Sequence, residues 1–178
     1  MMSDRHFQGN GIRLRAPEPE DLEVMFRFEN ATDVWETSNT TGPYSRFQLK
    51  QYIEQTQNDL FADRQLRLMI ENGNRQVVGI VDLCSFDPLH NRAEVGIMVD
   101  KSCRRQGIGR NALALLEEHC FRYLGIHQLF AYIAVENLPS RRLFAACGYK
   151  ESAVLKEWAH TFGGGYTDVL VVQKLNLS

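Results

Sequence analysis

Residues 104–109 constrain the fold more than any other part of this sequence. They read Arg-Arg-Gln-Gly-Ile-Gly and lie between an apolar, strand-like run and an amphipathic helix. Glycines at positions 107 and 109 open the backbone so that successive N–H groups can face one small anion, and the positive end of the helix dipole adds to the attraction. The segment therefore predicts a strand, a glycine-rich turn and a helix whose N-terminus binds a pyrophosphate.

Hydrophobic periodicity on both sides of this segment predicts a mixed α/β fold. Apolar residues recur every four positions from Ile108 to Leu124, and Gly125 follows where a helix C-terminal glycine belongs. Further helices are predicted at residues 21–30, 45–60 and 139–147, the second of which begins with a capping-box pattern at Ser45. Strands are predicted at residues 12–15, 67–71, 77–81, 93–99, 129–135, 149–154 and 169–175.

Composition limits the number of domains and the kinds of partner. With 178 residues, 44% hydrophobic and 24% charged, the chain is predicted to form a single domain over residues 1–178, with a core from about 12 to 175. The net charge of −2 gives no global field to hold nucleic acid or an anionic membrane surface. No run approaches the ~18 apolar residues of a membrane span.

The cysteines and histidines do not have the spacing of a metal site. Four cysteines, Cys84, Cys103, Cys120 and Cys147, fall on predicted strand or helix positions without a C-x-x-C pair. Such isolated thiols are typical of a reducing compartment. We therefore expect a cytoplasmic protein that binds no metal.

The order of elements and several short motifs resemble the GNAT superfamily of acyl-CoA-dependent N-acetyltransferases. The family motif Arg/Gln-x-x-Gly-x-Gly/Ala is met by Arg104, Gly107 and Gly109. Further matches are Ala-Glu-Val-Gly-Ile at residues 93–97, Glu136-Asn137-x-x-Ser140, and Cys147-Gly148-Tyr149. Gly165-Tyr166-x-Asp168 is similar to the branch that contains spermidine acetyltransferases and the RimJ/RimL acetyltransferases of ribosomal-protein N-termini. The resemblance implies a mixed, mostly antiparallel sheet flanked by helices.

Two other interpretations of the glycines are possible. Residues 107–112 also fit the dinucleotide fingerprint G-x-G-x-x-A, but that motif ends a first strand and is followed about 20 residues later by an acid that closes the next strand. Here the motif follows several strands, and no acid closes the run from Leu129 to Tyr132. A glycine-capped loop without a ligand is the second alternative. Neither explains the two arginines before the glycines.

The resemblance implies acetyl-CoA as cosubstrate and a set of residues that bind it. Backbone N–H groups of residues 104–110 would hold the pyrophosphate. The backbone of residues 97–99 would pair with the pantetheine arm like an added strand and place one N–H group at the thioester oxygen. Asn137 would meet a pantetheine amide, unless it only caps its helix. The predicted cosubstrate contacts are Ile97, Met98, Val99, Arg104, Arg105, Gln106, Gly107, Ile108, Gly109, Arg110, Asn137, Ser140 and Phe144.

Acetyl transfer to an amine also needs a base and a proton donor. A primary amine arrives protonated, with a pKa near ~10.4, and Glu94 on the strand before the carbonyl-binding segment is the candidate base. An ion pair with Arg92 or another neighbour is its alternative role. Many family members carry a tyrosine as donor where this chain has Phe144, which has no proton to give. Tyr149 is then the candidate donor, unless it is a packed aromatic residue and the thiolate leaves unaided or takes a proton from water.

The acceptor site is expected around the first two helices and their connection. Candidate contacts are Glu29, Asp33, Trp35 and Glu36, a small acidic set for a polycation. The amine acceptor is then a polyamine such as spermidine, a protein N-terminus or another small amine, and homo-oligomerisation is left open. Two further alternatives are an acyl-cysteine mechanism at Cys103 and a non-catalytic acyl-CoA-binding or sensor protein.

Overall fold

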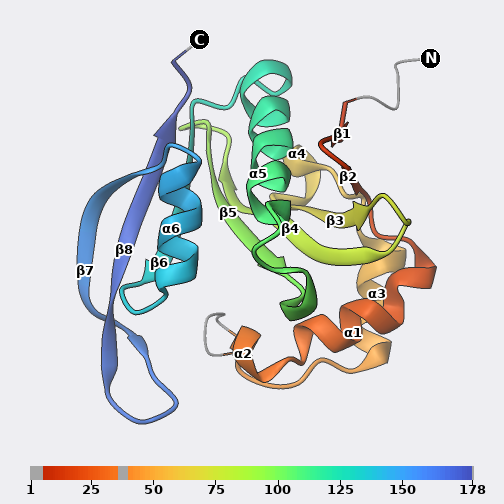
Figure 1. Ribbon diagram of the computed structural model, residues 1–178, viewed down its shortest axis with the longest axis horizontal. Helices are drawn as coiled ribbons and strands as arrows, with labels where there is room; N and C mark the ends of the chain where they lie inside the picture. Colours follow the sequence, from red (N-terminus) through yellow and green to blue (C-terminus); the bar gives the residue numbers. More distant parts are fainter. Residues whose placement is uncertain (1–5, 36–39, 178) are drawn as a thin grey trace.

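The computed structural model describes residues 6–35 and 40–177, and in this part of the chain eight strands form one sheet with helices on both faces (Figure 1). The strands are β1 (Gln8–Gly9), β2 (Ile12–Arg15), β3 (Leu66–Asn72), β4 (Val77–Asp87), β5 (Arg92–Val99), β6 (Gln128–Ala134), β7 (Lys150–His160) and β8 (Tyr166–Leu175). The α-helices are α1 (Leu22–Glu29), α2 (Thr32–Trp35), α3 (Arg46–Gln55), α4 (Leu60–Asp63), α5 (Ile108–Glu118) and α6 (Leu138–Ala146). Short 3-10 turns, η1 (Pro19–Asp21) and η2 (Lys101–Cys103), precede α1 and α5, and a π turn, η3 (His119–Tyr123), extends α5.

The sheet is mixed but mostly antiparallel, as predicted. Its strand order is β1-β2-β3-β4-β5-β6-β8-β7, and β5–β6 is the parallel pair among otherwise antiparallel neighbours in the described residues. The β5–β6 pair therefore joins two antiparallel parts of the sheet.

Strands β5 and β6 pair over only a short length. Arg92–Glu94 register with Gln128–Phe130, although β5 continues to Val99 and β6 to Ala134. The other edge of each strand is already bonded, β5 to β4 and β6 to β8. The facing edges of residues 95–99 and 131–134 therefore carry main-chain N–H and C=O groups that form no β-ladder with each other. We call this region the β5–β6 fork.

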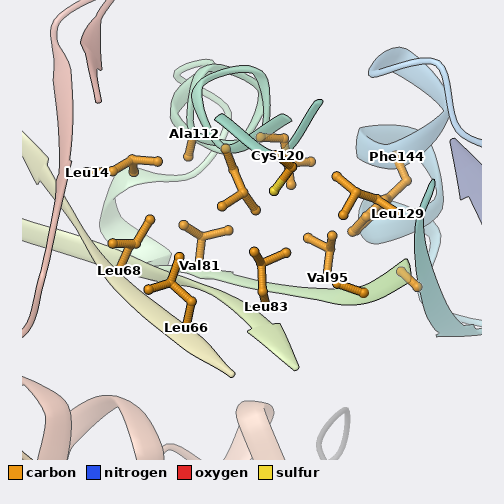
Figure 2. Packing of buried hydrophobic residues seen from close by; sticks show 14 of the residues in the cluster. Leu14, Leu66, Leu68, Val81, Leu83, Val95, Ala112, Cys120, Leu129 and Phe144 are labelled. Carbon is orange, nitrogen blue, oxygen red and sulfur yellow. The ribbon is translucent and has the colours of Figure 1, made fainter. Parts of the chain in front are cut away.

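Alternation along the strands divides the side chains between two faces. On one face, Leu68, Val81 and Val95 pack with α5 residues such as Ala112, and Phe144 of α6 joins the same cluster (Figure 2). The other face is covered by α1 and α3, and its cluster contains Met25, Phe28, Leu49, Met69 and Ile80. We refer to these as the α5 side and the α1 side of the sheet.

Most predicted elements are present, but the helix predicted at residues 45–60 is wrong in its second half. The capping box at Ser45 forms, with Gln48 N–H donating to Ser45 Oγ at 3.1 Å. The helix then ends at Gln55 because Thr56 adopts an extended backbone with ψ of 134°. A separate helix, α4, begins after Asp59, whose Oδ1 accepts hydrogen bonds from the N–H groups of Phe61 and Ala62.

Other elements also differ from the prediction. Strand β1 was not predicted, and β4 continues to Asp87, beyond the predicted end at residue 81. Helix α2 occupies part of the segment expected to be a polar connection. Strand β7 runs to His160, well beyond the predicted end at residue 154, although most of its residues are exposed. Among the described residues, none of the helices combines the length and apolar character needed to cross a membrane.

Candidate active site

The N-terminus of α5 presents backbone donors that no side chain in residues 6–35 or 40–177 caps. Gly107 precedes the helix with a φ of +79°, and Arg105 has a φ of +62°, so the backbone turns twice through the left-handed region. Such alternation directs successive N–H groups toward one concave side. Among the described residues no side chain caps α5, and the first N–H groups of a helix, here Ile108, Gly109 and Arg110, have no intrahelical acceptor. The local geometry fits the predicted anion site.

The side chains around this turn divide into braces and exposed charges. Arg104 Nε donates to the Val99 carbonyl at 2.9 Å, and its Nη2 donates to Asp33 Oδ2 at 3.0 Å. Lys101 also pairs with Asp33, at 3.4 Å. The Arg104 side chain therefore ties the end of β5 to α2, whereas the exposed Arg105 and Arg110 surround the free N–H groups with positive charge.

Asp33 forms ion pairs with Lys101 and Arg104 of this turn, and it does not line the cavity described below. Although partial burial opposes ionisation, hydrogen bonds from Arg104 and Lys101 lower its pKa below the ordinary value. Asp33 was predicted to contact the acceptor. In the structure it instead anchors the turn that precedes α5.

Helix α6 lies beside the fork and begins at Asn137. The Asn137 Oδ1 accepts the Ser140 N–H at 3.2 Å, so this side chain caps its helix, which is one of the two roles predicted for it. Phe144 is 2% exposed and meets Tyr149 edge to face, with ring centroids 4.9 Å apart. Phe144 is thus a core residue in this structure.

Tyr149 is also buried on the α5 side. Its residue is 5% exposed, and burial together with the nearby Glu117 carboxylate raises the pKa of the hydroxyl. Glu117 itself accepts a hydrogen bond from Lys174 Nζ at 2.5 Å. Because the hydroxyl is enclosed in this cluster, the geometry does not favour Tyr149 as the predicted proton donor.

The carbonyl-binding segment predicted at residues 97–99 forms the β5 edge of the fork. Gly79 of β4 supports it from the other edge. A Cβ atom built on Gly79 would lie 2.3 Å from the Met98 carbonyl oxygen. Only glycine fits this close approach of the two strands, and the position of Met98 therefore depends on it.

Glu94 occupies the last paired position of β5 before the fork. It lies on the α1 side because its neighbours Ala93 and Val95 belong to the α5-side cluster. Its carboxylate accepts a hydrogen bond from Ser85 Oγ at 3.1 Å. Arg92 pairs with Asp87 at 3.3 Å, and no Arg92–Glu94 ion pair forms among the described residues. The Glu94 carboxylate is half-buried and adjoins the fork.

A cavity of about 280 Å³ lies on the same face, between α1, α3 and strands β3 and β4. Residues that line it are Glu29, Tyr44, Gln48, Leu49, Tyr52, Gln65, Leu66, Arg67, Asp82, Leu83 and Cys84. Asp82 registers with Gly96 of β5, and Cys84 registers with Glu94. Since paired strands lie about 4.8 Å apart, the cavity is one strand away from the fork.

Three charged groups form the floor of this cavity. Arg67 donates to Asp82 through Nε at 2.9 Å and Nη2 at 2.7 Å, and to Glu29 through Nη1. Burial opposes the charged form of Arg67, but the Asp82 and Glu29 carboxylates raise its pKa, so the guanidinium stays charged. Two carboxylates against one guanidinium leave a net negative charge. The cavity therefore favours a cationic ligand such as an ammonium ion.

The other predicted acceptor residues occupy varied positions. Glu29 lines the cavity, as described. Trp35 Nε1 donates to the Glu29 carbonyl at 2.8 Å and so fixes the chain at the end of α1. Glu36 lies outside the described residues. Arg67 and Asp82 were not predicted, although an acid in the apolar run 77–84 is a usable signal.

Burial also affects the two cysteines that bear on the chemistry. Desolvation, and next the Glu94 charge, raise the pKa of Cys84 to about 12, so this thiol next to Glu94 stays protonated. Cys103 is half-buried in η2 and packs against the α5-side core. Its Sγ lies 3.6 Å from Ser102 Oγ.

Comparison with known proteins supports the predicted fold and chemistry. Residues 12–150 match the family model described as an acetyltransferase (GNAT) domain. The chain is 26% identical to spermidine N(1)-acetyltransferase of Vibrio cholerae over 162 residues, which covers 89% of each protein. It resembles a crystal structure of the V. cholerae spermidine N-acetyltransferase with CoA and spermine at a TM-score of 0.84 and 24% identity, covering 94% of this chain and 97% of that one. A dodecameric structure of spermidine N-acetyltransferase from V. cholerae aligns at a TM-score of 0.79 and 24% identity, covering 94% and 95%.

Proposed function

Because the chain belongs to the GNAT family of acetyltransferases, it is an acetyl-CoA-dependent N-acetyltransferase, and we propose that it acetylates a primary amine bound on the α1 side of the β5–β6 fork. The transfer is direct, from thioester to amine, while both substrates are bound. A non-catalytic acyl-CoA binder is not favoured, because the relatives are named as enzymes.

The cosubstrate site consists of the fork and of residues 104–107, which lead into α5 and which we call the α5 turn. The free N–H groups of residues 108–110, with the exposed Arg105 and Arg110 beside them, fit a pyrophosphate. The unpaired main chain of residues 95–99 offers the pantetheine amides the hydrogen bonds of an additional strand. Acetyl-CoA supplies the activated acetyl group as a thioester.

The amine acceptor is proposed to enter through the cavity between α1, α3 and β4. The net negative charge of Glu29, Arg67 and Asp82 attracts an ammonium group, and Tyr44 and Tyr52 provide aromatic walls. A polyamine such as spermidine is the first candidate because the V. cholerae relative bears that name. A protein N-terminus and other small primary amines are the alternatives.

Catalysis requires a neutral amine and a stabilised oxyanion. Glu94 lies between the cavity and the fork and is proposed to take the proton from the ammonium, directly or through water. A main-chain N–H of residues 97–99 then donates to the thioester oxygen as it becomes negative. Gly79 holds this segment in position because only glycine permits its contact with the Met98 carbonyl.

The observation that carries this proposal is the adjacency of three features: the uncapped α5 turn, the fork and a net negative cavity beside Glu94. A thiol-release assay with acetyl-CoA over polyamines, peptides with free N-termini and small monoamines tests it. We expect CoA release that depends on an amine, with acetylated product confirmed by mass spectrometry. Tight CoA binding without turnover on any of the amines would contradict it.

We also propose a cytoplasmic, homo-oligomeric protein that binds neither nucleic acid nor membranes. The four cysteines are free, in keeping with a reducing compartment where acetyl-CoA is available. A V. cholerae relative forms a dodecamer, and this chain leaves most of the edge strand β7 exposed. Light scattering during gel filtration would report the mass, and a monomer at micromolar concentration would contradict the oligomer.

A further inference from the structure

The leaving thiolate needs a proton, and the fork has few groups that can supply one. Residues 95–99 are apolar residues and one glycine, and Glu94 is already the proposed base. Phe144 has no acidic proton, and the Tyr149 hydroxyl is enclosed on the α5 side. Residues 131–134 of β6 read Ala-Tyr-Ile-Ala, so Tyr132 is the one residue of this segment whose side chain has an acidic proton.

Register places Tyr132 on the α1 side of the sheet, the same face as Glu94. Leu129, Ala131 and Ile133 belong to the α5-side cluster, so Phe130 and Tyr132 lie on the α1 side. Glu94 registers with Phe130 in the parallel pair, and Tyr132 lies two residues further along β6, about 6.6 Å, where the strands diverge. Tyr132 thus stands across the fork from Gly96, on the same face as Glu94.

The environment of Tyr132 leaves its hydroxyl available. The residue is 46% exposed, and in the described part of the chain no hydrogen bond engages the hydroxyl. Phe130 meets its ring edge to face, with centroids 5.7 Å apart, which restricts the ring to positions beside the fork. Gly96 has no side chain, and its Cβ direction has only Asp82 Cβ at 3.9 Å nearby. Space opposite the tyrosine is therefore open.

We propose that Tyr132 donates the proton to the sulfur of CoA as the acetyl group is transferred. This inference rests on the proposed acyl transfer in the fork. The amine nitrogen forms a bond to the carbonyl carbon, the carbon–sulfur bond breaks, and sulfur leaves with the bonding pair. The Tyr132 hydroxyl then protonates the thiolate. The resulting tyrosinate recovers a proton from the acetylated nitrogen, which must lose one, directly or through water.

Other donors near the fork are less suited. Arg141 of α6 donates to the Val135 carbonyl at 3.1 Å and to Glu151 at 3.1 Å, and a guanidinium does not give up its proton. Cys84 lies on the far side of Glu94, one strand away from β5. Bulk water remains the competing donor, and the experiments below separate it from Tyr132.

The first test compares Tyr132→Phe with the wild-type enzyme across pH. Loss of a general acid lowers kcat by about 100-fold or more, with little change in KM for acetyl-CoA. The wild-type rate should fall at alkaline pH as the general acid loses its proton, and this limb should be absent in the variant. Tyr123→Phe is the matched control, because Tyr123 is 57% exposed in η3, beyond the C-terminal end of α5. It should behave as wild type.

The second test needs no acceptor. Ultraviolet absorbance of the CoA thiolate reports the thiol pKa in the binary complex, and a tyrosine that donates to sulfur stabilises the thiolate. We expect the bound thiol pKa to be higher by about 1 unit in Tyr132→Phe than in wild type. Equal thiol pKa values, or an unchanged pH–rate profile, would overturn the role of Tyr132. A wild-type enzyme that binds CoA but acetylates no amine would instead overturn the proposed function, and the thiol titration would still decide this inference.

Discussion

At the scale of single residues, the distribution of charge on the α1 side decides which groups can act. Arg67 forms ion pairs with both Glu29 and Asp82, whereas the Glu94 carboxylate accepts a hydrogen bond from the neutral Ser85 hydroxyl. An ammonium group that approaches Glu29 or Asp82 must share the carboxylate with this guanidinium, whereas no cation of the described residues pairs with Glu94. This arrangement supports Glu94 as the proposed base.

Replacement of Glu94 tests this assignment. Glu94→Gln should lower kcat/KM for the amine by about 100-fold at neutral pH, as expected for loss of a general base. The deficit should shrink as the pH approaches the amine pKa of ~10.4, where free amine no longer needs a base. Stopped assays over this pH range would measure both effects.

Glu118→Gln is the matched control for this substitution. Glu118 is an exposed residue near the end of α5 that pairs with Arg122 at 3.3 Å. It should leave the pH–rate profile unchanged. A Glu94→Gln deficit that stays constant with pH would show that Glu94 does not act as the base.

At the scale of elements, the α5 turn depends on backbone conformation more than on side chains. Gly107 adopts a φ of +79°, a conformation that costs other residues about 1 kcal/mol or more. The turn is fastened by Arg104 and Asp33 on one side and by Asp100, which accepts the Ser102 N–H at 3.0 Å, on the other. Both kinds of constraint can be tested.

Gly107→Ala should weaken CoA binding. The strained backbone would displace the N–H groups that hold the pyrophosphate, and a loss of about 1.4 kcal/mol raises Kd tenfold. Gly164 in the β7–β8 turn has a similar φ of +86°, so Gly164→Ala carries the same strain away from the site. Calorimetry should find both variants destabilised but only Gly107→Ala impaired in CoA binding. Equal CoA affinity in the two variants would contradict the proposed pyrophosphate site at the α5 turn.

Acid should loosen the same turn. The Ser102 N–H and hydroxyl lower the pKa of Asp100 below its ordinary 3.8, and Arg104 and Lys101, acting against burial, lower that of Asp33. A lowered folded-state pKa means that the stabilisation is present above pH 3.8 and is lost as the pH falls through the folded-state pKa values. Hydrogen exchange of residues 101–106, corrected for intrinsic rates, should rise below about pH 4.

Asp100→Asn should reduce this pH dependence, because the amide does not titrate. Asp168, whose pKa is lowered by Lys156 on β7, provides the control variant Asp168→Asn. It should leave exchange in residues 101–106 as in wild type. Exchange in the turn that is independent of pH in the wild type would contradict the anchoring role of the two acids.

The elements nearest the cosubstrate turn were the most predictable from sequence. Strand β5, the turn and α5 each carry a local signal in periodicity or glycine placement. Helix α3 could not be delimited, because apolar residues continue through Leu60 although the backbone at Thr56 is extended. Arg67 and Asp82 were missed because their pairing depends on the β3–β4 register and on α1, none of which is local.

At the scale of the whole molecule, the sheet is divided at the fork, where the pantetheine arm is proposed to bind. Only three residue pairs join β5 to β6, so a ligand in the fork supplies contacts to both parts of the sheet. The mixed sheet could be predicted from element order. The short β5–β6 pairing could not, since apolar residues continue along both strands after they separate.

Cosubstrate binding should therefore stabilise the whole protein. At a CoA concentration of 100 times Kd, the free energy of unfolding should rise by about 2.7 kcal/mol, which corresponds to a Tm increase of roughly 5–10 °C for a chain of this size. Thermal scans with and without CoA would measure it. Exchange protection of residues 95–99 should rise in parallel, and a Tm shift without such protection would place CoA outside the fork.

A crystal structure of the CoA complex would show where the cosubstrate binds. We expect the pyrophosphate within hydrogen-bond distance of the N–H groups of residues 108–110 and the pantetheine arm between residues 95–99 and 131–134. We also expect the sulfur on the α1 side of the sheet, next to Glu94. CoA bound elsewhere, or a fork closed by direct β5–β6 pairing in the complex, would contradict the proposed cosubstrate site.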